Sequence, residues 1–243
     1  MRIGLIADIH GNAEALRTVL GQLSADHLDR IVCLGDVAVL GPQPGDVLRL
    51  LKEANCAVIR GNTDAWLLDE PSDATPPSPG PSQEILDWTL SVLTPSEIAQ
   101  VGESPITLDL DLGSGQRLRC SHGSPRSFED VIGPATPDAE VLALIGGGAA
   151  VMAGGHTHVQ MVRRLGATTF VNPGSVGLPG VGPGTDGLPV NQNVAWAEFA
   201  VLEDGDRGIG IELRRIPLDV AEMIRTAERS GMPHVDWWRS HWI

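Results

Sequence analysis

Residues 2–12 read RIGLIADIHGN, and this stretch carries the pattern that decides the fold. Its first part, residues 2–7, is apolar after the opening arginine and predicts a buried strand. Asn12 stands where the N-cap of a following helix is expected. Asp8 and His10 lie in the short connection between the two elements. Because ligands gather at the carboxyl ends of strands in α/β sheets, this stretch predicts an α/β fold with a polar site.

The same unit recurs further along the chain. Apolar runs at 30–34 and about 56–60 end at Gly35-Asp36 and Gly61-Asn62, and a helix is predicted at about 45–54 between them. Later strands are predicted at about 105–112, 116–121, 149–153, 168–171, 194–202 and 209–216, and a helix at about 218–230. Strands and helices in this order favour a largely parallel sheet with helices on its faces.

Residues 71–81 contain five prolines and predict a stiff surface loop. Residues 83–100 predict one or two helices, with Pro95 opening the second. We interpret about 66–104 as a small helical cap inserted into a single domain of residues 1–243. The cap is expected to shape substrate choice. The Gly- and Pro-rich stretch 177–189 predicts a loop near the site.

The chain of 243 residues carries a net charge of −14. Such a chain repels polyanions, which disfavours long nucleic acid and anionic membranes as partners, but a small phosphorylated substrate can bind through cations. No apolar run approaches the roughly 18 residues of a membrane span. The N-terminal residues lack the pattern of a signal peptide, and the three cysteines contain no C-x-x-C pair. We therefore expect reduced thiols and a cytoplasmic location.

Polar side chains that can bind metal follow the predicted strands. They are Asp8, His10, Asp36, Asn62, His122, His156 and His158. Carboxylate, imidazole and amide oxygen together suit Mn, Fe, Co, Ni or Zn. Residues two apart, such as Asp8 and His10, would face the same way in an extended segment. One ion does not need seven such ligands, whereas two ions sharing a carboxylate would.

These blocks resemble the calcineurin-like metallophosphoesterases, and within them the compact bacterial and archaeal phosphodiesterase-like branch. The blocks are Asp8-Ile9-His10-Gly11-Asn12, Gly35-Asp36, Gly61-Asn62, His122-Gly123-Ser124-Pro125, Gly155-His156-Thr157-His158 and Asn172-Pro173-Gly174-Ser175. The resemblance covers roughly residues 1–180 outside the cap, and ordered blocks are far more specific than any one of them alone. It implies a four-layer αββα sandwich with two mixed β-sheets flanked by helices.

The resemblance also implies a dinuclear site in which Asp36 bridges two divalent ions. Asp8, His10 and His158 would hold one ion, and Asn62, His122 and His156 the other. Mn²⁺ is the first choice, with Fe, Ni, Co or Zn as alternatives. Such ions, about 3.5–4 Å apart, activate a bridging hydroxide for in-line attack on phosphorus.

The groups expected to act in catalysis are Asp36, Asn62, His122 and Arg126. Arg126 follows the His122 block and Arg60 precedes Asn62, so these are the nearest cations in sequence for a phosphoryl group. Many members of the family carry a histidine directly after the Gly-Asn, thought to protonate the leaving group, but here the residue is Thr63. Val39-Leu40-Gly41 also stands where protein phosphatases carry Asp-Arg-Gly. Both departures weigh against a eukaryotic-type Ser/Thr phosphatase.

Three functions stay open at this point. The first is hydrolysis of phosphodiesters, aryl phosphates or nucleotide and polyphosphate anhydrides. The second is a protein or small-molecule phosphomonoester phosphatase. The third is a catalytically silent metal-dependent binding module, which predicts eroded ligands, and none of the seven is eroded.

The C-terminal aromatic residues Trp237, Trp238 and Trp242 we interpret as packing or homodimer contacts. His27, His234 and His241 lie outside the motifs, and we assign them no function.

Overall fold

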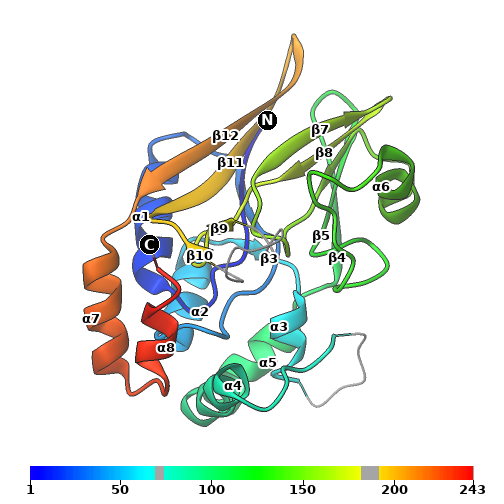
Figure 1. The fold of residues 1–243 in the computed structure, drawn as a ribbon. Coiled ribbons are helices and arrows are strands. Elements are labelled where there is room, and N and C mark those ends of the chain that lie inside the picture. Colours follow the sequence, from blue (N-terminus) through cyan, green and yellow to red (C-terminus); the bar gives the residue numbers. More distant parts are fainter. Residues whose placement is uncertain (69–73, 182–191, 243) are drawn as a thin grey trace.

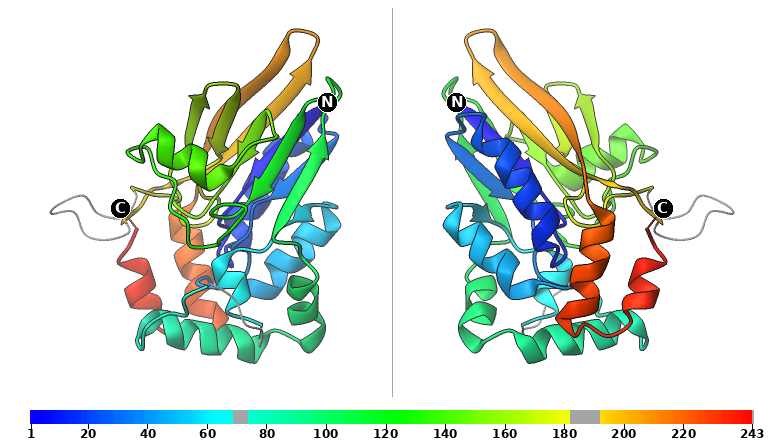
Figure 2. Two further views of the ribbon diagram at one scale, coloured as in Figure 1. Left: turned by 90° about the vertical axis from the view of Figure 1, so that its right-hand side faces the viewer. Right: turned by 90° about the vertical axis from the view of Figure 1, so that its left-hand side faces the viewer.

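The computed structural model describes residues 1–68, 74–181 and 192–242. Two five-stranded sheets stack face to face and helices cover both outer faces, as Figures 1 and 2 show. The first sheet has the order β12 (Gly208–Pro217), β11 (Trp196–Gly205), β1 (Arg2–Ile6), β2 (Arg30–Cys33) and β3 (Ala57–Val58). The second has the order β4 (Thr107–Asp111), β5 (Arg117–Ser121), β6 (Val151–Ala153), β8 (Thr168–Asn172) and β7 (Met161–Leu165). The predicted αββα sandwich is confirmed.

Both sheets are mixed. In the first, β1, β2 and β3 run parallel, and β11 pairs antiparallel with β1. In the second, β5, β6 and β8 run parallel, while β4 and β7 are antiparallel edge strands. The parallel strands form the centre of the second sheet, and in the first sheet they lie together on one side with β3 at the edge, so their carboxyl ends can converge on one site.

The strand β1 shows how the sequence builds two cores at once. Ile3 and Leu5 point into the layer between the sheets, where they join Leu118 and Val151 of the second sheet. Ile6 points the other way, into the layer between the first sheet and its helices. Because β1 is buried on both faces, its residues form a continuous apolar run with no alternating polar positions.

Three helices pack on the outer face of the first sheet: α1 (Ala13–Ser24), α2 (Pro44–Glu53) and α7 (Val220–Ser230). One helix, α6 (Asp138–Ile145), packs on the second sheet through Val141 and Ile145. The shorter elements are α3 (Asn62–Ala65), α8 (Val235–Arg239), β9 (Gly180–Val181) and β10 (Gln192–Asn193).

The predicted cap region contains α4 (Pro81–Val92) and α5 (Pro95–Gly102), so the second helix opens at Pro95 as expected. Thr94 caps α5 by accepting from the backbone N–H of Glu97. Residues 71–73 of the predicted Pro-rich loop, and 182–189 of the predicted Gly- and Pro-rich loop, lie outside the described residues. In the part of the chain that the structure describes, every helix is too short or too polar to cross a bilayer.

Asn12 occupies the N-cap position of α1, as predicted, but its side chain makes no capping bond. Its side-chain amide donates instead to the carbonyl oxygen of Gly177 at 2.8 Å. Asn12 therefore ties the first loop of the site to a segment 165 residues later. The strands β7, β9 and β10 and the helices α3, α6 and α8 were not predicted.

Candidate metal centre

All seven predicted ligands gather beyond the carboxyl ends of the parallel strands β1, β2, β3, β5 and β6. Asp8 and His10 follow β1, and Asp36 follows β2. Asn62 opens α3 after β3, and His122 follows β5. The pair His156 and His158 follows β6. Five of the side chains are buried and those of His156 and His158 are partly buried, although they come from five separate segments.

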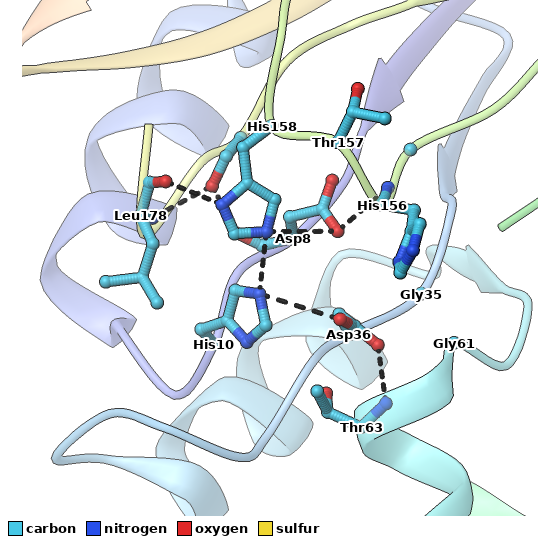
Figure 3. Close-up of polar contacts among 12 residues, drawn as sticks. Asp8, His10, Gly35, Asp36, Gly61, Thr63, His156, Thr157, His158 and Leu178 are labelled. Carbon is cyan, nitrogen blue, oxygen red and sulfur yellow. Dashed lines mark hydrogen bonds and ion pairs between the residues drawn. The ribbon is translucent and has the colours of Figure 1, made fainter. Parts of the chain in front are cut away.

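Asp8, His10 and His158 form the first group (Figure 3). The Nε2 atoms of His10 and His158 are 3.0 Å apart, and His158 Nε2 is 3.6 Å from Asp8 Oδ1. One oxygen of Asp36, Oδ2, lies 3.6 Å from His10 Nε2. Four donor atoms thus converge on a small volume.

Asn62, His122 and His156 form the second group. The Oδ1 atom of Asn62 lies 2.9 Å from His122 Nε2 and 3.1 Å from His156 Nδ1. The other oxygen of Asp36, Oδ1, lies 3.5 Å from His122 Nε2. Asp36 therefore presents one oxygen to each group, which is the geometry of a bridging carboxylate.

Backbone carbonyls set the tautomers of three histidines. The contacts join His10 Nδ1 to Val39 O at 3.0 Å, His122 Nδ1 to Leu34 O at 2.8 Å and His158 Nδ1 to Leu178 O at 2.7 Å. A carbonyl oxygen only accepts, so each Nδ1 must carry the proton. In the neutral rings the Nε2 lone pairs then face the site, as metal ligands require.

Two observations test whether these residues fit divalent ions. In the neutral tautomers, His10 and His158 bring two nitrogen lone pairs within 3.0 Å, which is repulsive unless a cation lies between them. The buried Oδ2 atom of Asp8 has no hydrogen-bond partner. A buried carboxylate oxygen without a partner is costly, and a metal ion removes that cost. The residues fit the ions.

The titration behaviour of the histidines agrees with this fit. Burial, with the charge of His10, lowers the pKa of His158 to about 3. Burial, with the charge of His122, lowers the pKa of His156 to about 4. Burial also lowers the pKa of His10. These rings are therefore neutral near pH 7, so they can bind a cation without first losing a proton.

The buried carboxylates attract positive charge into the centre. Burial alone would raise the pKa of Asp36, but the neighbouring imidazoles, His122 first, outweigh it and hold that pKa low. Burial raises the pKa of Asp8 well above its ordinary value, so its ionised form needs a cation beside it. For His122, burial lowers the pKa, but Asp36 and Asp8 outweigh it and the net shift is upward. A cation at His122 Nε2 is thus favoured electrostatically.

Most of the ligands sit in a strained backbone conformation. Positive φ angles occur at Asp8 (54°), His10 (48°), Asp36 (56°), His156 (67°) and His158 (56°). Residues with a Cβ rarely adopt this left-handed region, and such residues cluster at functional sites. We expected Asp8 and His10 to face the same way in an extended segment, and this is wrong. The backbone turns sharply at both residues, and these turns bring the two side chains together.

A close approach of two loops brings Asp36 and Asn62 together. A Cβ at Gly61 would lie 2.2 Å from Asp36 Oδ1, and a Cβ at Gly35 would lie 2.6 Å from Gly61 N. Only glycine fits at either position. The glycines of the Gly35-Asp36 and Gly61-Asn62 pairs are therefore needed because a side chain at either position would collide with the neighbouring loop.

Asp64 fastens the same two loops. Its carboxylate accepts from the backbone N–H groups of Asp36 at 2.7 Å, Val37 at 2.9 Å and Gly61 at 3.0 Å. Burial and then the charge of Asp36 raise the pKa of Asp64 to about 6, while two of these amide bonds oppose the rise. Three amide donors favour the ionised form, and through them Asp64 positions the two loops.

The predicted Asn172–Ser175 block braces the ligand loops from behind. Asn172 donates to the carbonyl oxygen of Gly155 at 2.8 Å, next to His156. The hydroxyl of Ser175 donates to the carbonyl oxygen of Asp8 at 2.7 Å. Both side chains are fully buried. Each bond fixes a backbone segment that carries a ligand.

The centre opens into a cavity of about 430 Å³. His10, Asp36, Asn62, His156 and His158 line one part of it. The remaining lining includes residues from the C-terminus, which the sequence interpretation had left without a role at the site. They are Trp237, Trp238 and His241. A run of aromatic residues was their only signal in the sequence.

Of the two predicted cations, neither lines this cavity. Arg126 is exposed, and its backbone N–H donates to Ser124 Oγ at 3.1 Å. The guanidinium of Arg60 donates to the carbonyl oxygen of Gly102 at the end of α5. The contact predicted between Arg126 and substrate phosphate stays a prediction.

Comparison with known proteins places this centre in a family. The model of the calcineurin-like phosphoesterase superfamily domain matches residues 1–188. An uncharacterized protein of Methanocaldococcus jannaschii is 24% identical to this chain. The matched region covers 95% of this chain and 93% of that protein.

Two solved structures share the fold. A hypothetical protein from Pyrococcus horikoshii superposes with a TM-score of 0.80 at 19% identity, covering 98% of this chain and 96% of that one. A metallophosphoesterase from Sphaerobacter thermophilus superposes with a TM-score of 0.72 at 22% identity, covering 99% and 98%. Because the family model spans most of the chain, the protein belongs to the calcineurin-like phosphoesterase superfamily and is a metallophosphoesterase.

Proposed function

We propose that this metallophosphoesterase is a dinuclear-metal-dependent hydrolase of small phosphorylated substrates. The proposed substrates are phosphodiesters, aryl phosphates, or nucleotide or polyphosphate anhydrides. The observation that carries the proposal is the position of Asp36, whose two oxygens lie 3.6 Å from His10 and 3.5 Å from His122. Two divalent ions, when bound, lower the pKa of coordinated water and offset the charge of the phosphoryl oxygens.

The residues would divide between the ions as the two groups suggest. Asp8, His10 and His158 would hold one ion, Asn62, His122 and His156 the other, and Asp36 both. Mn²⁺ is the proposed metal, and Fe, Co, Ni and Zn suit the same mixed donor set. The carbonyl-bonded Nδ1 atoms and the Asp64 carboxylate keep these groups oriented before substrate arrives, which lowers the cost of reorganisation during the reaction.

A panel of substrates tests the hydrolase against its alternatives. The panel contains an aryl phosphodiester, an aryl phosphomonoester, an alkyl phosphomonoester and a dinucleoside polyphosphate, each with Mn²⁺-loaded and chelator-treated protein. We expect turnover that disappears with chelator and returns with Mn²⁺. Faster turnover of the alkyl monoester than of the diester would favour the phosphomonoester phosphatase. Full metal loading without turnover of any substrate would favour the binding module.

The threonine at position 63 predicts which leaving groups the enzyme prefers. Its backbone N–H donates to Asp36 Oδ1 at 2.9 Å, and a threonine hydroxyl does not give up a proton usefully near neutral pH. Help from a general acid contributes about 10²–10⁴-fold to the rate, and a poor leaving group needs it most. We therefore expect substrates with aryl oxide or phosphate leaving groups to react much faster than simple alkyl monoesters.

The measurement is kcat/KM across a series of phosphate esters of increasing leaving-group pKa. A steep decline is expected if the enzyme lacks the acid. A flat line would mean that another group supplies the proton, and would refute the argument from Thr63.

Arg126 offers a separate prediction. If its guanidinium reaches the substrate phosphate, Arg126→Ala should raise KM while Mn²⁺ affinity stays unchanged. The control is Arg117→Ala, because Arg117 is exposed on β5, away from the cavity lining. An unchanged KM on every substrate of the panel would remove Arg126 from the site.

A further inference from the structure

The cavity beside the metal centre is far larger than one phosphoryl group requires. Its volume of about 430 Å³ lies in the range of pockets that hold drug-sized ligands. Apart from the proposed ligands, large apolar side chains dominate the lining: Leu40, Trp66, Val131, Leu178, Trp237 and Trp238. Val131 is 52% exposed and Trp237 is 37% exposed, so two exposed apolar side chains line this cavity.

The C-terminal segment is anchored firmly enough to form a wall. Trp238 is only 3% exposed, packs in the core on the helix side of the first sheet, and lies 5.5 Å from Trp242. The ring of Trp237 lies 4.5 Å from that of His241 in an edge arrangement. The burial of Trp238 fixes α8, and this leaves Trp237 turned toward the cavity.

A series of contacts connects this wall to the metal centre. The ring of His158 bonds to Leu178 O, close to β9. The strand β9 pairs with β10, and the N–H of Asn193 in β10 donates to the carbonyl oxygen of His241 at 2.6 Å. Figure 2 shows the C-terminal segment beside this short strand pair. These contacts fix the position of the C-terminal segment relative to His158, one of the proposed ligands.

The charge of the lining restricts what can bind. Among the described residues that line the cavity there is no lysine or arginine. Bound divalent ions can balance one phosphoryl group, but a chain of further phosphates would meet no protein cation there. A neutral aromatic group suits the tryptophan wall, because rings prefer stacked or edge-to-face contacts with other rings.

We propose that Trp237, supported by His241, binds an aromatic ring in the ester group of the substrate, and that the substrate carries a single phosphoryl group. This inference rests on the proposed function and narrows it to aryl or nucleoside esters, leaving out polyphosphates. It also replaces the interpretation of Trp237 as a packing or homodimer contact and of His241 as a residue without function.

Two phosphonates that differ only in the ring test the inference by binding, without turnover. Phenylphosphonate and methylphosphonate are titrated calorimetrically into the Mn²⁺-loaded protein and into three variants: Trp237→Ala, Trp237→Phe and Asp236→Asn. Asp236 is the matched control, because it is exposed on the same helix and does not line the cavity.

The native protein should bind phenylphosphonate about tenfold more tightly than methylphosphonate, as expected for one aromatic contact. Trp237→Ala should lose most of this preference while its affinity for methylphosphonate stays unchanged. Trp237→Phe and Asp236→Asn should keep it. Equal affinities in the native protein, or a preference that survives Trp237→Ala, would overturn the inference. If neither phosphonate bound to the metal-loaded protein, the proposed function itself would fail, and the inference with it.

Discussion

The variant Asp36→Asn is expected to lose activity by about 10³-fold or more in kcat/KM and to bind Mn²⁺ more weakly. Asp36 places one oxygen near each ligand group, and the neighbouring histidines, His122 first, hold its pKa low despite burial. Asparagine has the same shape but no negative charge, and only one of its two terminal atoms can accept a metal. The shared ligand would be lost while the fold is kept.

The measurement is kcat/KM at saturating Mn²⁺ together with calorimetric metal titration. The matched control is Asp111→Asn, because Asp111 is 88% exposed at the end of β4 and should change neither quantity. Wild-type turnover by Asp36→Asn with Mn²⁺ would refute the bridging role.

The second large effect is expected from Gly61→Ala. The added methyl group would lie 2.2 Å from Asp36 Oδ1 and 2.6 Å from Asp36 N, so the loops that carry Asp36 and Asn62 must separate. A misplacement of about 1 Å in a catalytic group can cost about 10²-fold in rate. Crowding of a packed site usually costs about 1–3 kcal/mol of stability. We expect both losses together.

Gly21→Ala is the control for this experiment. Gly21 lies in α1, and a Cβ there would meet no atom within 4 Å. Alanine should raise the free energy of unfolding by about 0.4–1 kcal/mol and leave kcat/KM unchanged. Chemical denaturation and the substrate panel measure both variants. Full activity in Gly61→Ala would show that the two loops need not touch.

The ligand positions could be predicted because each follows a buried strand that the apolar pattern reveals. Asp8, Asp36 and His122 come directly or shortly after such runs, and the structure brings them together. The local geometry could not be predicted. The left-handed backbone at Asp8 and His10 depends on bonds to the next loop, such as His10 N to Asp36 O at 2.9 Å.

The other residues that line the cavity could not be predicted from the sequence, for a related reason. Trp237 and His241 lie about eighty residues after the last proposed ligand, and only long-range contacts place them at the cavity. Asn12 is a similar case, since its partner Gly177 lies 165 residues away. Two of the elements that were not predicted have weak patterns. The strand β7 contains two adjacent arginines, and α6 has apolar residues around most of its surface.

The measurement that tests the dinuclear centre most directly is anomalous diffraction at the manganese edge from crystals grown with Mn²⁺. Two peaks are expected. One should lie among Asp8, His10 and His158, the other among Asn62, His122 and His156, and Asp36 should contact both. A single peak, or peaks away from Asp36, would contradict the account.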